Sequence, residues 1–542
     1  MLTQLLLLIF VGGIFAWVVE NHRPGTAKWV SLFTIIIASL SFADIIRQNP
    51  DVFVDYLPFS LTPWISSFNI YYATAADSLS VVLIYLTLFL AVICILVSWK
   101  EIKHRVGFYY FNLMASIAGI IGVFIASDLF LFFFFWEVML LPMTALIAIW
   151  GHEKRVFAAI KFFIFTQLSS LLMLIAIIAL AFVHKQQTGA LSFDYFALQK
   201  LNIDIELQWY LMLGFFIAFA VKLPSFPVHS WLPDAHTQAP TAGSVLLAGV
   251  LLKTGAYGLI RFVLPLFPDA TEAFADTAML LGVISIIYGA KLAFAQTDFK
   301  RLVAYSSISH MGFIMLALFS FNAIAYQGAL VTMVAHGLSS AALFSMAGFL
   351  YQRLHSRDLA IMGGLFASAP IMGGMLLAFV AAAFGLPGML NFVGEFMALV
   401  GSFASNPTLV IIAALGLIGS AIYGMHLFQR SFQGKVSHEI IDLNARELLV
   451  CISLLGALIV FGMKPNLLLN NLLVTSAGDL TVIQPIANVN TNSKANTKAN
   501  TDANTQADAQ LKLLKQTALK QTAQQRISAP VISSNNVEKG DE

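Results

Sequence analysis

Apolar runs of membrane-spanning length recur along the first 470 residues, with short polar connections between them. An α-helix needs about 20 mostly apolar residues to cross the hydrocarbon core of a bilayer. Helices are expected because lipid offers no partner to an unpaired backbone N–H or C=O group. The pattern therefore predicts an all-α polytopic membrane protein with about 14 transmembrane helices. We place these helices at residues 2–19, 28–46, 77–98, 108–126, 128–149, 156–183, 207–231, 240–262, 275–295, 302–320, 324–350, 367–400, 407–428 and 447–465.

The composition indicates the same class of protein. The 542 residues are 59% hydrophobic and 11% charged, whereas an ordinary globular domain is about 45–50% apolar and about 25% charged. This excludes a string of soluble domains, and a lipid bilayer is the expected surrounding. The formal net charge is only +2, so we expect no nucleic-acid partner.

Lysine and arginine are unevenly shared between alternate connections. One set of connections holds 15 of them, including Lys300 and Arg301, and the other set holds 5, including Arg261. Short loops that are rich in these residues stay in the cytoplasm. With an even number of spans, both termini are then expected on the periplasmic side.

The segment from about residue 480 to residue 542 differs from the rest. It contains a polar repeat of four residues, seen at Lys494, Lys498 and Asp502, with no apolar face. Such a low-complexity tail is expected to be disordered. A weak amphipathic pattern between Leu511 and Arg526 leaves a short surface helix as the alternative.

Charged residues inside the apolar runs carry the functional signal. Glu137 and Lys253 both lie deep within predicted spans. A charge at the centre of a span costs about 2.5–3.5 kcal/mol on insertion scales, and such residues usually mark ion or proton pathways. The alternative for Glu137 is a static buried ion pair, and Lys253 could instead bend toward water along its flexible stem.

Two spans are interrupted by proline. Lys222 is followed by Pro224 and Pro227, and Glu395 follows Pro387 by eight residues. Proline removes helix hydrogen bonds and should break both spans. Broken helices at membrane depth line protein or a wet cavity and commonly hold ion sites.

The paired breaks predict the organisation of the chain, because interrupted spans in two halves are typical of inverted-repeat transporters. We expect two inverted five-helix repeats, at 108–262 and 275–428. N-terminal transmembrane helices would occupy 1–107, and a last helix would occupy 447–465.

Several histidines lie near these charges. His310 and His336 are in apolar spans, where a hydrogen-bonded core role and a proton relay are about equally plausible. His229, Asp234 and His236 lie near a predicted membrane interface. Solvation or helix capping would be enough to explain these three.

The chain offers no recognisable redox site. Cys94 and Cys451 are isolated in apolar runs, and no spacing suits a haem or an iron–sulfur cluster. Neither a phosphate-binding glycine loop nor a nucleophile elbow is present, and we identify no strand to carry one. Any redox cofactor is therefore expected in partner proteins.

Two stretches carry a family resemblance. They are Trp231-Leu-Pro-Asp-Ala-His-Thr-Gln-Ala-Pro-Thr241, within a longer match from Lys222 to Arg261, and Thr297-Asp-Phe-Lys-Arg-Leu-Val-Ala-Tyr-Ser-Ser307. Over about residues 1–470 the chain resembles the antiporter-like membrane subunits of respiratory complex I, the proton-pumping NADH:quinone oxidoreductase. In that family the glutamate at the second broken helix is typical of the subunit M type, also called chain 4.

The resemblance implies a function and a set of site residues. Glu137, Lys222, Lys253 and Glu395 match the family's proton-transfer residues, and His310 and His336 match the path between them. It further implies a bacterial inner membrane, other membrane subunits on both sides, and flavin, iron–sulfur clusters and quinone in partner subunits.

We therefore expect a proton-translocating membrane subunit of NADH:quinone oxidoreductase. Glu137 would modulate Lys222, Lys253 would be the central relay, and Glu395 would release protons on the exit side. Two alternatives stay open: a subunit of a multisubunit sodium/proton antiporter, and a structural spacer in a membrane assembly.

Overall fold

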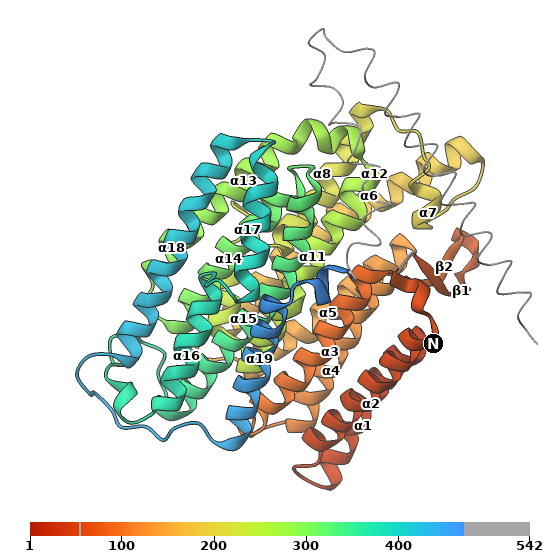
Figure 1. The fold of residues 1–542 in the computed structure, drawn as a ribbon. Helices are drawn as coiled ribbons and strands as arrows, with labels where there is room; N and C mark the ends of the chain where they lie inside the picture. Colours follow the sequence, from red (N-terminus) through yellow and green to blue (C-terminus); the bar gives the residue numbers. More distant parts are fainter. Residues whose placement is uncertain (54–55, 471–542) are drawn as a thin grey trace, which may run out of the picture. The chain divides into compact units, whose positions relative to one another are not determined.

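The computed structural model describes residues 1–53 and 56–470, and within them the chain is helical almost throughout (Figure 1). The predicted tail, 480–542, lies outside the described residues. The long helices that are continuous are α1 (Leu2–His22), α2 (Ala27–Gln48), α3 (Ser78–Ser98), α4 (Val106–Ile125), α5 (Leu129–Trp150), α6 (Arg155–Thr188), α8 (Ile205–Lys222), α13 (Pro268–Phe294), α14 (Phe299–Leu318), α15 (Ala323–Leu354), α18 (Pro407–Phe432) and α19 (Ala445–Met463).

One further long helix is a composite. It runs from Thr241 to Leu266, and two of its stretches are π-helical. Its parts are α10 (Thr241–Leu246), the π segment Leu247–Leu251, α11 (Leu252–Gly258), the π segment Leu259–Val263 and α12 (Leu264–Leu266).

The number of spans agrees with the sequence-based prediction. Within the described residues, 13 helices, counting the composite as one, are long and apolar enough to cross a membrane. The fourteenth predicted span, 367–400, is divided into α16 (Pro370–Ala383) and α17 (Leu390–Phe403). The prediction of a helical membrane protein with two broken helices is confirmed, while the limits of the two repeats stay a prediction.

Both predicted breaks are present. α8 ends at Lys222, and the chain resumes a helix only at α9 (Trp231–Gln238). Between α16 and α17, Gly385 and Gly388 adopt positive φ angles of 79° and 95°, a conformation that glycine adopts without a steric penalty. The chain thus leaves the helical path at the same kind of Leu-Pro step in both places.

The expectation that the chain has no strands is wrong in one place. Strands β1 (Leu57–Ile65) and β2 (Ile70–Ala76) form an antiparallel hairpin closed by Asn69 in the left-handed conformation, at φ 56°. Tyrosine, threonine and isoleucine favour strands, but Pro58 and Pro63 within β1 weaken the strand signal in the sequence. The backbone N–H of Ser127 donates to the carbonyl of Ala73, which ties the hairpin to the turn before α5.

Some helix limits also differ from the predicted ones. α13 begins at Pro268 rather than at residue 275, because proline is well suited to the first helical position. Its first turns are polar, so the hydropathy pattern does not show where the helix begins. The remaining short elements are a four-residue helix, α7 (Tyr195–Leu198), and 3-10 turns at Pro50–Phe53, Ser66–Phe68 and Leu365–Ala367.

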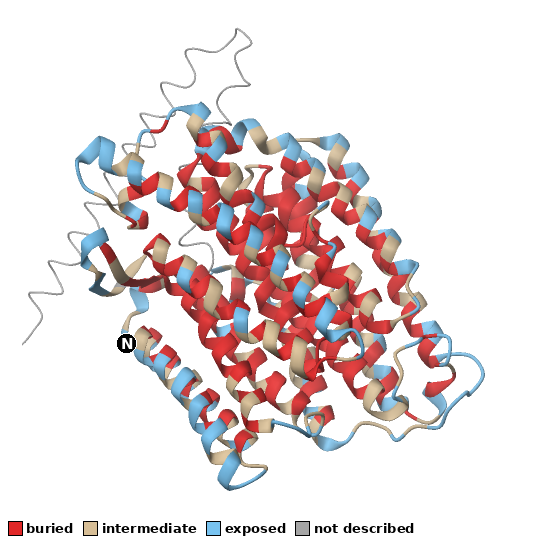
Figure 2. Cartoon of the chain, turned by 180° about the vertical axis from the view of Figure 1, so that it is seen from behind, coloured by how far each residue is buried: buried red, intermediate tan, exposed pale blue. Residues whose placement is uncertain are grey.

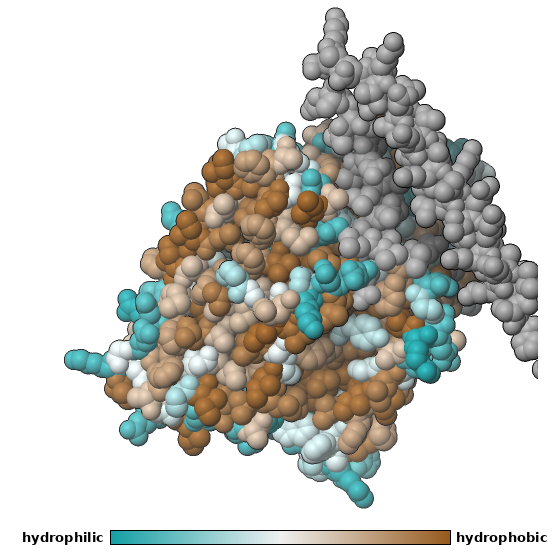
Figure 3. Space-filling view, viewed as in Figure 1, coloured by the Kyte–Doolittle hydropathy of each residue, from teal (hydrophilic) through white to brown (hydrophobic). Residues whose placement is uncertain are grey.

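Burial separates central from peripheral helices (Figure 2). In the most apolar 18-residue stretch of each helix, all residues of the composite helix and of α15 are buried, whereas 39% of those of α6 are. Large apolar side chains such as Leu168 and Ile175 on α6 are exposed. Figure 3 shows apolar side chains spread over the region of α16 and α18. An apolar exterior around a more polar centre is what a bilayer environment requires.

Candidate functional site

Lys222 ends the first half of the broken helix and is only 1% exposed. Its Nζ atom has no hydrogen-bond partner among the described residues. The ammonium group lies 5.2 Å from the ring centre of Trp136 and 5.6 Å from that of Phe162. Such aromatic faces attract a cation weakly, so the position of Lys222 holds a charge without fixing it in a hydrogen bond.

Glu137 lies on α5 and is half-buried. Its Oε1 atom accepts a hydrogen bond of 2.5 Å from the Ser170 hydroxyl of α6. No nitrogen of a basic side chain in the described parts of the chain lies within 4.0 Å of this carboxylate. The charge of Glu137 nevertheless acts on Lys222. This geometry does not support a static ion pair and is compatible with action at a distance.

Lys253 is fully buried on α11, between the π segments Leu247–Leu251 and Leu259–Val263. Its Nζ atom donates to the carbonyl of Ala248 over 2.6 Å and lies 2.7 Å from Nδ1 of His336. A π turn shifts the helix hydrogen-bond pattern, and the Ala248 carbonyl lies in such a turn. Because both partners are buried, the alternative in which Lys253 bends toward water is excluded by this geometry.

A line of polar groups continues from Lys253 across the interior. The ring centres of His336 and His310 are 5.6 Å apart. Nδ1 of His310 lies 2.6 Å from Oε1 of Glu395, and its Nε2 lies 3.1 Å from the hydroxyl of Tyr423. Both histidines and Glu395 are at most 3% exposed. The structure thus brings four of the six predicted site residues into one continuous group.

Three polar atoms along this line have no hydrogen-bond partner among residues 1–53 and 56–470. They are Nε2 of His336, Oε2 of Glu395 and Oδ1 of Asn391. Asn391 and Glu395 lie one helical turn apart on α17, so they share a face, and the amide of Asn391 donates to Ser339 of α15 over 3.2 Å. Buried polar atoms of this kind are expected to bind internal water.

The helices of Lys222 and Lys253 pack in direct backbone contact. A Cβ atom added to Gly255 would lie 2.7 Å from the backbone nitrogen of Leu223, so only glycine fits at this crossing. Among the described residues there is no hydrogen-bonded link between Lys222 and Lys253 themselves. The structure brings their helices together and leaves the two ammonium groups separate.

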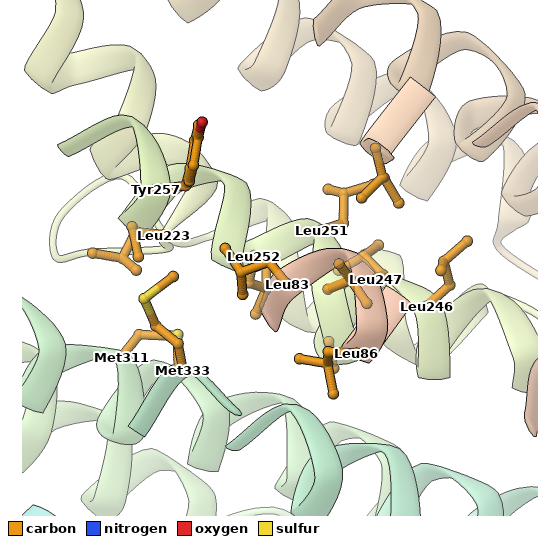
Figure 4. Close-up of a cluster of buried hydrophobic side chains, with 14 of the residues drawn as sticks. Leu83, Leu86, Leu223, Leu246, Leu247, Leu251, Leu252, Tyr257, Met311 and Met333 are labelled. Carbon is orange, nitrogen blue, oxygen red and sulfur yellow. The ribbon is translucent and has the colours of Figure 1, made fainter. Parts of the chain in front are cut away.

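Apolar side chains form a buried cluster between α3, the composite helix, α14 and α15 (Figure 4). Leucines of α3 pack against leucines of the composite helix, and methionines of α14 and α15 lie beside Leu223. This packing lowers the local dielectric, which strengthens every charge interaction inside it. The labelled residues are Leu83, Leu86, Leu223, Leu246, Leu247, Leu251, Leu252, Tyr257, Met311 and Met333.

Three residues that we expected near a membrane interface are not explained by solvation or helix capping. His236 is fully buried and stacks on Phe344 at 4.5 Å, and His229 is 6% exposed, so solvation is the wrong explanation for both. Asp234 is partly exposed and binds Lys161 at 2.7 Å and Arg301 at 3.3 Å. It forms ion pairs rather than a helix cap.

Two basic residues assigned to connections from the sequence are buried instead. Lys300 is 1% exposed, and its Nζ atom donates to the carbonyl of Ala239. Arg261 is 6% exposed and pairs with Asp77, with the ring of Tyr257 5.8 Å away. Both lie near ends of spans, where hydropathy does not separate a loop charge from a buried one.

Asp128 is a further polar residue that sequence reasoning missed. It precedes α5 and accepts hydrogen bonds from the backbone N–H groups of Phe130, Leu131 and Tyr71. Burial raises its pKa to about 6, although these hydrogen bonds act in the opposite direction. An aspartate one residue before a helix is the sequence signal for such a cap.

The described residues contain no cluster of three or more His, Cys, Asp or Glu side chains that could hold a metal ion. Cys94 and Cys451 are both buried free thiols. Any site for quinone, flavin or an iron–sulfur cluster is assigned to partner proteins only through the family resemblance.

The comparisons with known proteins agree with that resemblance. Residues 126–422 match the family described as the NADH:quinone oxidoreductase/Mrp antiporter transmembrane family. The NADH-quinone oxidoreductase subunit M of Pseudomonas aeruginosa is 48% identical over 484 residues, which are 86% of this chain and 94% of the relative. The subunit M of Escherichia coli K12 is 47% identical over 487 residues, covering 87% and 96%.

A solved structure shows the same fold. A chain of the respiratory complex I from Thermus thermophilus with bound NADH superposes with a TM-score of 0.80 at 28% identity, covering 89% of this chain and all of that one. The curated relatives bear the subunit M name rather than an antiporter name, so the sodium/proton antiporter is a relative and not the assignment. The chain belongs to the antiporter-like membrane subunits of NADH:quinone oxidoreductase, within the subunit M group.

Proposed function

We propose that this subunit carries protons through Lys222, Lys253, His336, His310 and Glu395, with Glu137 controlling Lys222. The transfer would be driven by quinone reduction in partner subunits. One observation carries the proposal: Lys253, His336, His310 and Glu395 form a continuous buried line of groups that exchange protons. Intramembrane ionisable residues in such an arrangement mark proton relays.

Charge coupling supplies the physical mechanism. An anionic Glu137 favours the ammonium form of Lys222, while burial favours the neutral amine. Moving or neutralising Glu137 would therefore release a proton from Lys222 toward Lys253. Moving one charge against 100 mV costs about 2.3 kcal/mol, and a change of three pKa units corresponds to about 4 kcal/mol, which is sufficient.

The setting of the subunit completes the proposal. We place it in the bacterial inner membrane, with both termini periplasmic and with membrane subunits on both sides. The uneven distribution of Lys and Arg supports this orientation. Exposed apolar side chains on α1, α6 and α18 support contact with lipid and with neighbouring subunits. Redox cofactors would lie in the partners.

The test uses the assembled complex in proteoliposomes. Lys253→Met removes the proton-accepting nitrogen but keeps the length of the side chain, and Lys253→Arg keeps a cation. We expect Lys253→Met to abolish quinone-driven proton uptake, whereas exposed Lys291→Gln, on the neighbouring surface of α13, should leave it intact. If the Lys253→Met complex takes up a normal number of protons for each quinone that is reduced, the proposal is refuted.

The same vesicles test the structural-spacer alternative. A spacer needs no titratable groups, so Lys253→Met would assemble, turn over and pump normally. A sodium/proton antiporter would instead show an ion gradient that depends on added sodium without quinone. Proton uptake that requires quinone turnover and is unaffected by sodium supports the proposed function.

A further inference from the structure

We propose that Lys300, held beside Glu101, is the group through which protons pass from the cytoplasmic surface to His236 and then to Lys253. This inference rests on the proposed function and adds an uptake route to it. Lys300 is not among the residues that the family resemblance assigns to the path. The argument starts from its position, because a fully buried lysine requires an explanation.

Lys300 lies in the first turn of α14 with its head group inside the protein. The Nζ atom donates to the carbonyl of Ala239 over 2.9 Å. Ala239 ends α9, the second half of the first broken helix, and two residues later the composite helix that carries Lys253 begins. Lys300 therefore contacts the junction between the broken helix and the helix of the central lysine.

Glu101 holds the other side of the same junction. Its Oε1 atom accepts from the backbone N–H of Thr241 at 3.0 Å and from the Thr241 hydroxyl at 2.9 Å. Its second oxygen is buried and has no hydrogen-bond partner among the described residues. The charge of Glu101 acts on Lys300. A carboxylate with one free oxygen next to a lysine suits proton exchange, since it stabilises the ammonium form without trapping it in a direct pair.

A polar cavity leads from the surface toward this place. Its volume is about 710 Å³, and its lining includes His152, Gln238, Asp298 and Arg357. Asp298 caps the start of α14, two residues before Lys300, and binds Arg357 at 3.1 Å. Asp298, near Lys300 in the chain, and Gln238, next to Ala239, thus line a cavity that opens at the surface.

Arg357 connects the cavity wall to the interior. Its guanidinium donates to the carbonyl of Thr237 over 2.6 Å, next to His236 in the chain. The cavity lining includes Arg155, and the adjoining Lys154 lines a neighbouring pocket. The distribution of basic residues assigns both to the cytoplasm. The cavity therefore opens on the side from which protons would be taken up.

Two histidines, His152 and His355, lie in the cavity lining, and the charge of Lys300 acts on His152. Burial, together with the charges of Lys300 and Arg357, lowers the pKa of His152 to about 3. His152 is neutral at any working pH, and Arg357 stays protonated. Among the groups that act on Lys300 from neighbouring elements, this leaves Glu101 and Asp298 as its acidic neighbours.

His236 provides the next step inward. It is fully buried, and neither ring nitrogen has a hydrogen-bond partner in the described part of the chain. Lys300 and Lys253 both act on it electrostatically, so it is within electrostatic range of both lysines. Its stacking on Phe344 fixes the ring while leaving both nitrogens free to bind water and to transfer a proton.

A purely structural role makes a different prediction from an uptake role. If Lys300 only holds the Ala239 carbonyl, its loss should weaken assembly or reduce turnover by the same factor at every pH. If Lys300 collects protons, its loss should matter most where protons are scarce. The turnover of a Lys300 variant should then fall more steeply with rising pH than that of the unmodified complex.

The experiment measures quinone-coupled proton uptake between pH 6 and pH 8.5 in proteoliposomes of the assembled complex. We expect Lys300→Met to lower uptake by about tenfold at the alkaline end and by much less at pH 6, a loss within the range of a missing acid–base group. Lys300→Arg should keep the contact to Ala239 but show the same alkaline loss. Lys291→Gln is the exposed control.

His236→Gln tests the route if Lys300→Met fails to assemble. It should reproduce the alkaline loss, because glutamine keeps polarity but does not carry a proton as imidazole does. A pH profile parallel to that of the unmodified complex in the assembled variants would overturn the inference. Lys253→Met in the same preparation separates the two proposals: if it abolishes pumping while the Lys300 and His236 variants behave normally, only the uptake route is wrong.

Discussion

The two broken helices share a backbone device and differ in their chemistry. Both follow a Leu-Pro step with non-helical chain at membrane depth. The first presents Lys222, whose Nζ atom has no hydrogen-bond partner in the described residues. The second leads to Glu395, which is held at 2.6 Å from His310. The first break holds a buried lysine that has no direct hydrogen-bond partner among the described residues. The second holds a glutamate that is hydrogen-bonded to a histidine.

The contrast explains why the two charges would play different parts. A buried lysine without a direct partner changes protonation when a remote charge changes, because nothing local compensates it. A carboxylate bonded to histidine exchanges protons with that neighbour instead. The first site is suited to receive a signal and the second to pass on a proton.

Of changes at the two broken helices and their partners, replacing Lys222 should have the largest effect. Lys222→Met removes the responsive cation while keeping its packing between Trp136 and Phe162. We expect proton uptake per quinone reduced to fall by about 100-fold or more, the range for loss of an acid–base group. Proteoliposome uptake assays measure this. Equal coupling in Lys222→Met and in Lys291→Gln would show that the lone cation is not required.

Neutralising Glu395 should have a smaller effect. Glu395→Gln keeps an acceptor for His310 but removes the charge, which is worth about 1.4 kcal/mol when a charged hydrogen bond becomes a neutral one. That corresponds to about a tenfold loss of coupled turnover. Tyr423→Phe, which removes only the hydroxyl at 3.1 Å from His310, is the matched control and should cost less. A greater loss in the tyrosine variant would reverse our ranking of the network.

Removing the hydroxyl that holds Glu137 should change turnover modestly. Ser170→Ala deletes the 2.5 Å hydrogen bond and leaves the carboxylate half-buried. A loss of about 1 kcal/mol predicts about a fivefold decrease in coupled turnover. Ser169→Ala, whose hydroxyl bonds only to the helix backbone, is the control. The idea that Glu137 must be held in place fails if both variants are equal.

The cap of α5 should affect stability and not turnover. Because burial raises the pKa of Asp128 from 3.8 to about 6, the folded chain keeps a proton that the unfolded chain has lost between these values. Stability from this residue therefore falls as pH rises from about 4 to about 6, by up to about 3 kcal/mol. Asp128→Asn keeps a side-chain oxygen that can cap α5 and removes this dependence of stability on pH.

Thermal unfolding of the purified complex measures this difference. The difference in unfolding temperature between the Asp128→Asn variant and the unmodified complex should change in favour of the variant as the pH rises from 4.5 to 7. A difference that stays constant with pH would contradict the proposed cause of the pKa shift.

Hydropathy was sufficient to predict most of the fold, because the bilayer imposes one length and one kind of secondary structure. Proline predicted both breaks for a similar reason, since its missing N–H acts locally. The β-hairpin escaped prediction because the pairing of its two strands depends on a turn at Asn69 and on contact with the chain before α5.

The candidate site was predicted in part. Glu137, Lys222, Lys253 and Glu395 stand out because each interrupts a long apolar run. Lys300, Arg261 and His236 did not, because a charge or histidine near the end of a span looks the same whether it points to water or inward. Tyr423 gives no signal in an apolar helix, and only the distance to His310 reveals it.

The π segment Leu247–Leu251 affects the stability of the charged form of Lys253. Its Ala248 carbonyl accepts a hydrogen bond from Lys253 in addition to the contact of Lys253 with His336. If a protonated His336 repels the ammonium group of Lys253, that group can still donate a hydrogen bond to the Ala248 carbonyl. Proton transfer would then not leave an unsolvated cation in the apolar interior. A local widening of the helix thus keeps both the loaded and the unloaded lysine solvated by protein.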